Sequence, residues 1–141
     1  MSTKELEARV NRLYLELNTL NSIAESLQRQ YDSLSNTSTS IQLTLNTLKE
    51  IKNIRKGHEI YIPLGPSVYI LVSILDNSNA LLNVGAGVII KKPISSIEEY
   101  LNDQLTQIQR EQLAVQKKLQ EVLNAISSIQ AELNKLLSKS P

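Results

Sequence analysis

Apolar residues recur at alternating steps of four and three through the first third of the chain. One line of this pattern holds Leu6, Leu13, Leu20, Leu27, Leu34, Ile41 and Leu48, and a second holds Val10, Leu17, Ala24, Tyr31, Ser38 and Leu45. A 3.5-residue period sustained over six heptads is typical of a coiled coil rather than of the amphipathic helix of a globular domain. The pattern therefore predicts one long helix over about residues 3–55.

Signals for the ends of this helix lie at both sides of the pattern. Ser2 and Glu5 have the spacing of a capping box, which predicts a start at about residue 3. Gly57 follows two cations and predicts a stop with positive charge in the last turn. Residues 33–40 are rich in Ser and Thr, which lower helix propensity. Because the heptads continue in phase through this segment, we expect a continuous helix that is locally soft there.

The same spacing returns in the last third of the chain. Its positions are Leu101, Leu105, Ile108, Gln112, Val115, Leu119, Val122, Ile126, Ile129, Leu133 and Leu136. They predict a second long helix over about residues 95–138. Ser95 with Glu98, or Ser96 with Glu99, would supply a capping-box start just after a proline.

An antiparallel pair is the economical arrangement of these two helices, because the segment between them must return the chain. If the chain reverses near residue 75, residue i of the first helix faces roughly residue 150 − i of the second. This mapping brings Ser38 close to Gln112, and a polar layer shared by two helices helps to fix their register. It also leaves Leu6 with little or no partner at the far end.

The segment between the helices has a different pattern. All four glycines and three of the four prolines lie in it or beside it. Runs rich in Ile and Val lie at about residues 59–64, 67–75, 80–85 and 88–92, with turn signals at Gly65-Pro66, Asp76–Asn79 and Gly85–Gly87 between them. These runs predict four strands that form two β-hairpins.

Both faces of the predicted strands are apolar. In the second run Val68, Ile70 and Val72 point to one side, whereas Tyr69 and Leu71 point to the other, and the fourth run is similar. Two-sided apolar strands need cover on both faces, and isolated hairpins are marginal in water. We therefore expect the insert to pair with other chains in an oligomeric β-barrel, which also removes exposed strand edges. The assembly residues would be Ile60, Ile62, Leu64, Val68, Tyr69, Ile70, Leu71, Val72, Val84, Val88 and Ile90.

The predicted fold class is thus α+β, a long antiparallel two-helix coiled coil with a central insert of two β-hairpins that joins an oligomeric β-barrel. It divides the chain into a first coiled-coil helix at residues 1–56, an assembly insert at residues 57–93 and a second coiled-coil helix at residues 94–141.

Composition mainly excludes functions. With no cysteine and a single histidine, His58, the chain offers no nucleophile–base pair and no metal-ligand set. The Gly85–Gly87 turn lacks the third glycine, the lysine and the hydroxyl of a phosphate-binding loop. A net charge of +1 gives no basic surplus for nucleic acid. We therefore expect no enzyme activity, no cofactor, no metal and no nucleic-acid partner. A polar start and the absence of a long apolar run predict a cytoplasmic protein without a membrane partner.

Two segments of the insert resemble a known family. Residues 60–70 (IYIPLGPSVYI) and residues 83–90 (NVGAGVII) are similar to the insert segments of prefoldin, and two hairpins rather than one are typical of its alpha-type subunit. Lys91 and Lys92 depart from the family, in which a more acidic ending is common. The resemblance covers the whole chain in architecture, whereas the specific motifs lie between about residues 57 and 100.

The resemblance implies a hexamer of two alpha-type and four beta-type subunits, with two β-barrels and projecting coiled coils. It also implies an ATP-independent chaperone that holds unfolded polypeptides and delivers them to a group II chaperonin. The partners would be a second alpha-type subunit, beta-type subunits, unfolded polypeptides and the chaperonin.

The expected client-binding surface is formed by the helix ends that lie farthest from the insert, namely the start of the first helix and the end of the second. The candidate residues are Leu6, Val10, Leu13, Tyr14, Leu133, Leu136 and Leu137. Several weak apolar contacts from several helix ends would bind by avidity without sequence specificity. The alternative is that these residues only complete the coiled-coil core. For the protein as a whole, the second hypothesis is a coiled-coil scaffold or tether that holds no clients.

Overall fold

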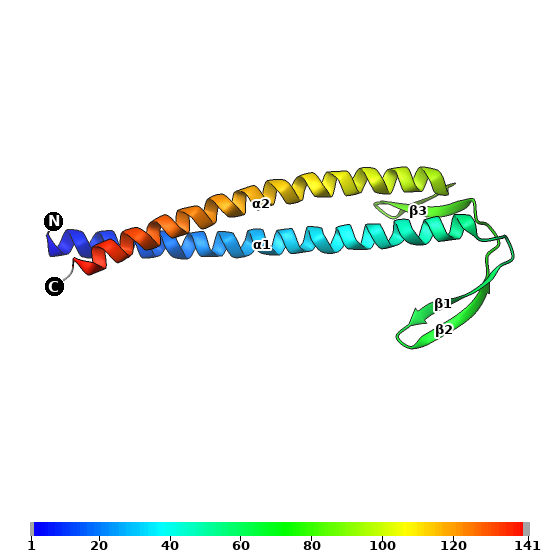
Figure 1. Ribbon diagram of the computed structural model, residues 1–141, viewed down its shortest axis with the longest axis horizontal. Coiled ribbons are helices and arrows are strands. Elements are labelled where there is room, and N and C mark those ends of the chain that lie inside the picture. Colours follow the sequence, from blue (N-terminus) through cyan, green and yellow to red (C-terminus); the bar gives the residue numbers. More distant parts are fainter. Residues whose placement is uncertain (1, 140–141) are drawn as a thin grey trace. The chain divides into compact units, whose positions relative to one another are not determined.

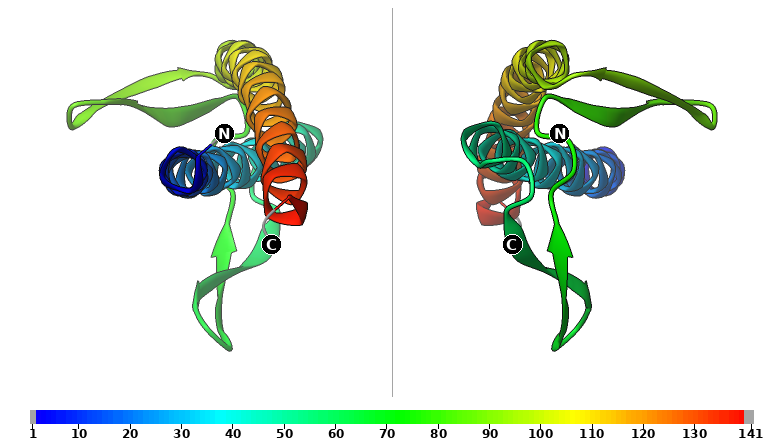
Figure 2. Two further views of the ribbon diagram at one scale, coloured as in Figure 1. Left: turned by 90° about the vertical axis from the view of Figure 1, so that its left-hand side faces the viewer. Right: turned by 90° about the vertical axis from the view of Figure 1, so that its right-hand side faces the viewer.

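The computed structural model describes residues 2–139 (Figure 1). Its elements in order are α1 (Thr3–Asn53), β1 (Glu59–Gly65), β2 (Val68–Ser73), β3 (Asn79–Gly85), β4 (Val88–Pro93) and α2 (Ile94–Ser138). The strands form two separate antiparallel hairpins, β1–β2 and β3–β4 (Figure 2). The expected architecture of two long helices around two hairpins is confirmed. A barrel is not closed within the chain, as expected for an element that needs several chains.

The chain forms two compact units. One contains Met1–Thr37 with Ile108–Pro141, and the other contains Ser38–Gln107. Each helix contributes to both units, and both hairpins lie in the second. The three-part division at residues 57 and 93 is a separate prediction, which these units do not test.

The start of α1 follows the predicted capping box. The Glu5 amide donates to the Ser2 hydroxyl at 3.2 Å, and the Ser2 amide donates to the Glu5 carboxylate at 3.4 Å. The helix ends at Asn53, slightly before the predicted stop, so Lys52 is the cation of its last turn. Gly57 has φ +84° in the turn that follows, where its amide donates to the Ile74 carbonyl at 2.6 Å. That conformation favours glycine because it carries no Cβ.

The predicted capping box of α2 is wrong. The helix begins at Ile94, before both serines, because β4 runs directly into it. The Ile94 amide donates to the Ser78 carbonyl at 2.9 Å, which occupies the first helical donor. Glu98 instead forms an ion pair with Lys52 at 2.7 Å. This pair fits the antiparallel mapping, in which residue i faces residue 150 − i, because 52 and 98 add up to 150.

Burial along both helices follows the heptads. Every heptad position named above is buried or half-buried in the structure. In the first unit, Leu13, Leu133 and Leu136 form a buried cluster against which Leu6, Val10, Leu17 and Ile129 pack. In the second unit the buried residues are Ile41, Ile94 and Ile97. The core of each unit is therefore a narrow seam rather than a globular interior.

The Ser- and Thr-rich segment at residues 33–40 is helical throughout, as predicted. The Thr37 hydroxyl donates to the Ser33 carbonyl at 3.1 Å, a local bond that removes the hydroxyl from competition with the helix. The Gln112 amide donates to the Ser35 hydroxyl at 2.9 Å. A polar contact between the helices thus lies one turn from Ser38, close to its predicted position.

Asp76 organises the turn that links the two hairpins. Its carboxylate accepts the amides of Ser78 at 2.8 Å and Asn79 at 3.2 Å, and the Asn79 side chain at 3.2 Å. The Ser78 amide bond is the largest of the effects that hold the pKa of Asp76 below its ordinary value, and Lys91 at 3.9 Å adds a smaller one. Asn77 donates from its side chain to the Ile54 carbonyl at 2.7 Å, which ties the turn to the end of α1.

We predict that Asp76→Asn lowers the thermal midpoint at neutral pH, because a neutral amide accepts hydrogen bonds more weakly than a carboxylate. A depressed folded-state pKa stabilises the fold above the unfolded-state value of about 4, and this contribution is lost as pH falls through the folded-state pKa. The difference between wild type and variant should therefore be constant near neutrality and shrink in strong acid. Circular dichroism melts across pH measure it, with Asp103→Asn as the control. A difference that grows in acid would contradict the assignment.

Candidate functional surfaces

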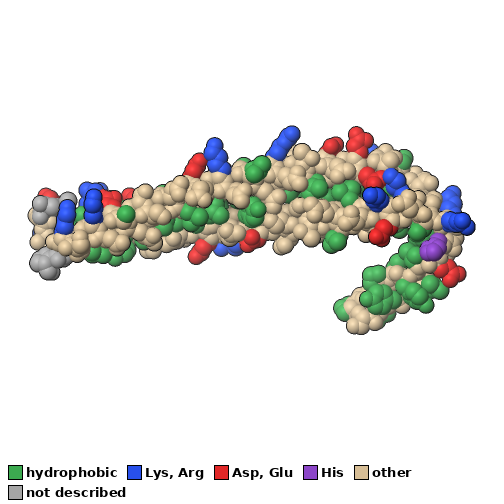
Figure 3. All heavy atoms as spheres, viewed as in Figure 1, with side chains coloured by type: hydrophobic (Ala, Val, Ile, Leu, Met, Phe, Trp, Pro, Cys, Tyr) green, Lys and Arg blue, Asp and Glu red, His purple; other side chains and the backbone are tan. Residues whose placement is uncertain are grey.

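The β1–β2 hairpin carries two different apolar faces. The register pairs Ile60 with Val72 and Ile62 with Ile70 on one face, which we call the aliphatic face. It pairs Tyr61 with Leu71 and Pro63 with Tyr69 on the other, which we call the tyrosine face. Tyr61 is 69% exposed and Tyr69 is 64% exposed. Both faces are therefore apolar, as the alternation predicts, and both carry exposed side chains in the single chain. Figure 3 shows how apolar side chains gather on the hairpin in one view.

The β3–β4 hairpin is less apolar than predicted. Leu82 pairs with Ile90 on one face, and both are half-buried. On the other face, the Leu81–Lys91 and Asn83–Ile89 pairs set a polar residue beside each apolar one. The Ala80–Lys92 pair lies on the same face as Leu82 and Ile90, so each face of this hairpin combines apolar and polar side chains. The fourth run is apolar on both faces only over Val88–Ile90.

The predicted assembly residues lie mostly on open surface. Ile62, Leu64, Val68, Tyr69, Ile70, Leu71, Val84 and Val88 are exposed, whereas Ile60, Val72 and Ile90 are half-buried. The sequence interpretation omitted Tyr61, Leu81 and Ile89, which are also large, apolar and exposed. The strand alternation could have identified Tyr61 and Ile89, because each lies between two residues that were named. Assembly contacts for the whole set stay a prediction.

The predicted client-binding residues separate into two groups. Leu13, Leu133 and Leu136 are buried, and Leu6 and Val10 pack against them. The expectation that Leu6 lacks a partner is wrong, because Leu6 packs against the cluster that contains Leu133 and Leu136. Tyr14 is 44% exposed and Leu137 is 48% exposed. In the free chain, these two are the members of the set available for contact.

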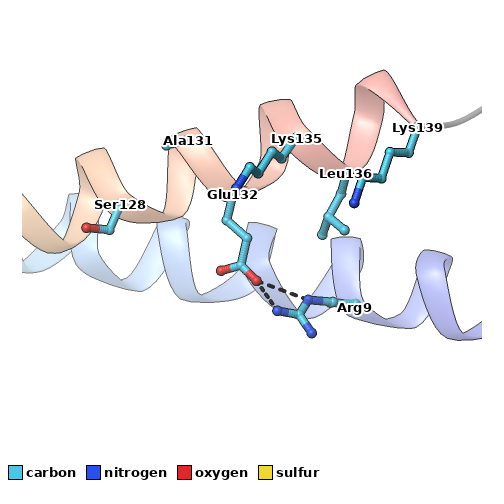
Figure 4. A pocket seen from close by; sticks show the side chains of 7 residues that line it. All are labelled: Arg9, Ser128, Ala131, Glu132, Lys135, Leu136 and Lys139. Carbon is cyan, nitrogen blue, oxygen red and sulfur yellow. Dashed lines mark hydrogen bonds and ion pairs between the residues drawn. The ribbon is translucent and has the colours of Figure 1, made fainter. Parts of the chain in front are cut away.

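Two grooves lie at these helix ends. The apolar groove has a volume of about 270 Å³ and is lined by Leu6, Glu7, Val10, Asn11, Leu136 and Leu137. The cationic groove has a volume of about 720 Å³ and is lined by Arg9, Ser128, Ala131, Glu132, Lys135, Leu136 and Lys139 (Figure 4). Leu136 lines both grooves. The Arg9 guanidinium binds the Glu132 carboxylate through two of its nitrogens, the Nε–Oε1 distance being 3.0 Å.

Residues 2–139 contain no group of three or more His, Cys, Asp or Glu side chains arranged to hold a metal ion. His58 lies in the turn before β1, where its backbone amide donates to the Arg55 carbonyl at 3.1 Å. In this described range, neither helix is apolar enough over its length to cross a membrane.

The sequence matches one family of known proteins. The family model described as "Prefoldin subunit" matches residues 4–139. The chain belongs to the prefoldin family. Prefoldins are a family of chaperone-type subunits that form hetero-oligomeric complexes, rather than a class of enzymes.

The similar prefoldins with curated descriptions are archaeal alpha subunits. Prefoldin subunit alpha of Archaeoglobus fulgidus is 27% identical over 132 residues, which covers 94% of this chain and 93% of that protein. Prefoldin subunit alpha of Methanopyrus kandleri is 24% identical over 116 residues, covering 82% and 74% of the two chains. The resemblance to the alpha type is thus confirmed across nearly the whole chain.

A solved prefoldin has the same fold. The cryo-EM structure of filamentous PFD from Methanocaldococcus jannaschii matches with a TM-score of 0.75 at 18% identity, covering 84% of this chain and 98% of that one. At this identity the match shows the fold alone.

Leu133 and Leu137 provide a matched test of the two groups of residues at the helix ends. Leu133→Ala should lower the free energy of unfolding by about 2–5 kcal/mol, because the side chain is removed from a buried cluster. Leu137→Ala, at an exposed position, should change it by no more than about 0.5 kcal/mol. Urea unfolding followed by circular dichroism measures both. Equal losses would show that the two positions are not distinguished as core and surface.

Proposed function

We propose that this alpha-type prefoldin chain is part of an ATP-independent chaperone that holds unfolded polypeptides at the helix ends and delivers them to a group II chaperonin. It assembles with a second alpha-type subunit and with beta-type subunits through its hairpins, and it works in the cytoplasm. The observation that carries the proposal is the apolar surface of the β1–β2 hairpin, which the chain itself leaves open on both faces.

The hairpins support the assembly step. The aliphatic face presents Ile62 and Ile70, and the tyrosine face presents Tyr61, Tyr69 and Leu71, all of them exposed. Burying apolar surface stabilises an interface by roughly 25 cal/mol per Å². The chain itself leaves these side chains exposed. Strands from other chains would cover the faces and pair the free edges.

The helix ends support the capture step. Tyr14 and Leu137 are exposed there, and Leu15, just beside Tyr14, is 68% exposed. The apolar groove adds a concave surface floored by Leu136. Each such contact is weak, but an assembly that presents several helix ends would bind one unfolded chain by avidity. Weak and mobile contacts also suit a chaperone that must release its client to a chaperonin.

The chain carries no chemistry for an energy-driven cycle. It has no cysteine and one histidine, and its Gly85–Gly87 turn is a tight turn between β3 and β4 with Ala86 at φ +52°. A phosphate-binding loop would lead into a helix instead. We therefore assign the chain no enzyme activity and no nucleotide cofactor.

The holding activity is tested by diluting a chemically unfolded enzyme into buffer without nucleotide and following light scattering. The chain together with its beta-type partner should suppress aggregation, whereas a coiled-coil scaffold or tether would not. Removing residues 1–14 and 131–141 shortens both helix ends and should abolish suppression while leaving the hairpins intact. Undiminished suppression by the truncated assembly would contradict capture at the helix ends.

The assembly step has a separate prediction. Ile62→Asp places a charge on the aliphatic face and should dissociate the complex, because an unpaired buried charge costs several kcal/mol. Ser67→Asp is the matched control: it adds the same charge at the hairpin turn, where φ is +65° and aspartate is tolerated. Native mass spectrometry of the chain with its beta-type partner reads out both. An intact complex with Ile62→Asp would overturn the assigned interface.

A further inference from the structure

The cationic groove carries a charge that the fold leaves uncompensated. Two of its lining residues, Arg9 and Glu132, form an ion pair with each other. Among the described residues, no carboxylate lies within ion-pair distance of Lys135 or Lys139. The groove therefore keeps two positive charges beside a neutralised pair. The Lys139 side chain extends beside Leu136, and both project toward α1 (Figure 4).

The two lysines bring like charges to one groove. Lys135 lies in the last turn of α2, and Lys139 lies in the turn directly after it, where its amide donates to the Leu136 carbonyl at 3.3 Å. Two cations lining the same groove repel each other, although the negative end of the helix dipole partly offsets the repulsion. A carboxylate bound between them would relieve the repulsion that the free chain retains.

The groove is large enough for an extended segment, and its apolar lining consists of Leu136 and Ala131. Leu136 is 8% exposed and projects toward α1, whereas Ala131 lies more than a turn away along α2 (Figure 4). The groove's volume of about 720 Å³ lies within the range of sites that bind small molecules and short peptides. The apolar groove differs in charge, because Glu7 is its one charged residue among the lining side chains. The two grooves therefore suit segments of opposite character.

We propose that the cationic groove binds segments of unfolded polypeptide in which an acidic side chain lies next to an apolar one. The apolar side chain packs on Leu136, and the carboxylate lies between Lys135 and Lys139. This inference rests on the proposed function and adds a substrate class to it. If the lysines serve only to complement the helix dipole, they contribute stability but give no preference for acidic segments.

The test compares two fluorescent peptides that differ only in Glu or Gln next to each Leu. Fluorescence anisotropy measures their binding to the full-length chain in the assembly that it forms in solution. The acidic peptide should bind about three- to ten-fold more tightly at low salt, as expected for two exposed ion pairs. The preference should shrink as ionic strength rises, because exposed charges are screened.

Variants assign this preference to the groove. Lys135→Gln with Lys139→Gln should abolish it, and Lys135→Arg with Lys139→Arg should retain it. Lys117→Gln with Lys118→Gln is the matched control, since it removes the same charge at exposed positions of α2 that do not line the groove. Circular dichroism melts check that all variants remain folded. A preference that persists without Lys135 and Lys139, or that the control also loses, would overturn the proposal.

The outcome also separates this inference from the proposed function. If the assembly suppresses aggregation of an unfolded enzyme but binds the two peptides equally, the acidic preference is wrong and the holding function stands. If it neither suppresses aggregation nor binds either peptide, both are wrong.

Discussion

The structure depends on one constraint: a short hairpin with two apolar faces cannot be covered by the chain that contains it. The heptad side chains of both helices already pack into narrow seams, so these side chains are not available to cover the hairpin. The aliphatic and tyrosine faces of β1–β2 stay open as a consequence. In this account assembly completes the fold, because the surface that other chains cover is the one that the hairpin could not bury by itself.

At the start of α1 and the end of α2, by contrast, the chain buries its own apolar side chains. Leu13, Leu133 and Leu136 form a buried cluster there. What remains for binding is the surface around that cluster, namely the exposed Tyr14 and Leu137 and the two grooves that share Leu136. A closed core beneath a small open surface allows weak capture without loss of the coiled coil.

The periodic parts of the chain were predictable. The cap of α2 was not, nor was the division of the residues at the helix ends into buried and exposed ones. Heptad spacing and strand alternation determine which residues face each other, so both helices and both hairpins were expected at nearly their observed bounds. The cap of α2 was predicted wrongly because β4 runs directly into Ile94, whose amide donates to the distant Ser78 carbonyl. Leu6 was misjudged because a single constant for the antiparallel mapping does not hold along the whole pair: Arg9 faces Glu132 rather than the end of the chain. The cationic groove is lined by residues from both ends of the chain, so a pattern within either segment alone could not predict it.

The central claim is that the open hairpin faces make the free chain incomplete. Sedimentation equilibrium of the unmodified chain at micromolar concentration tests it most directly, alone and with its beta-type partner. The account predicts oligomers of defined mass with the partner and no stable monomer without it. A monodisperse monomer that stays folded at that concentration would contradict the account.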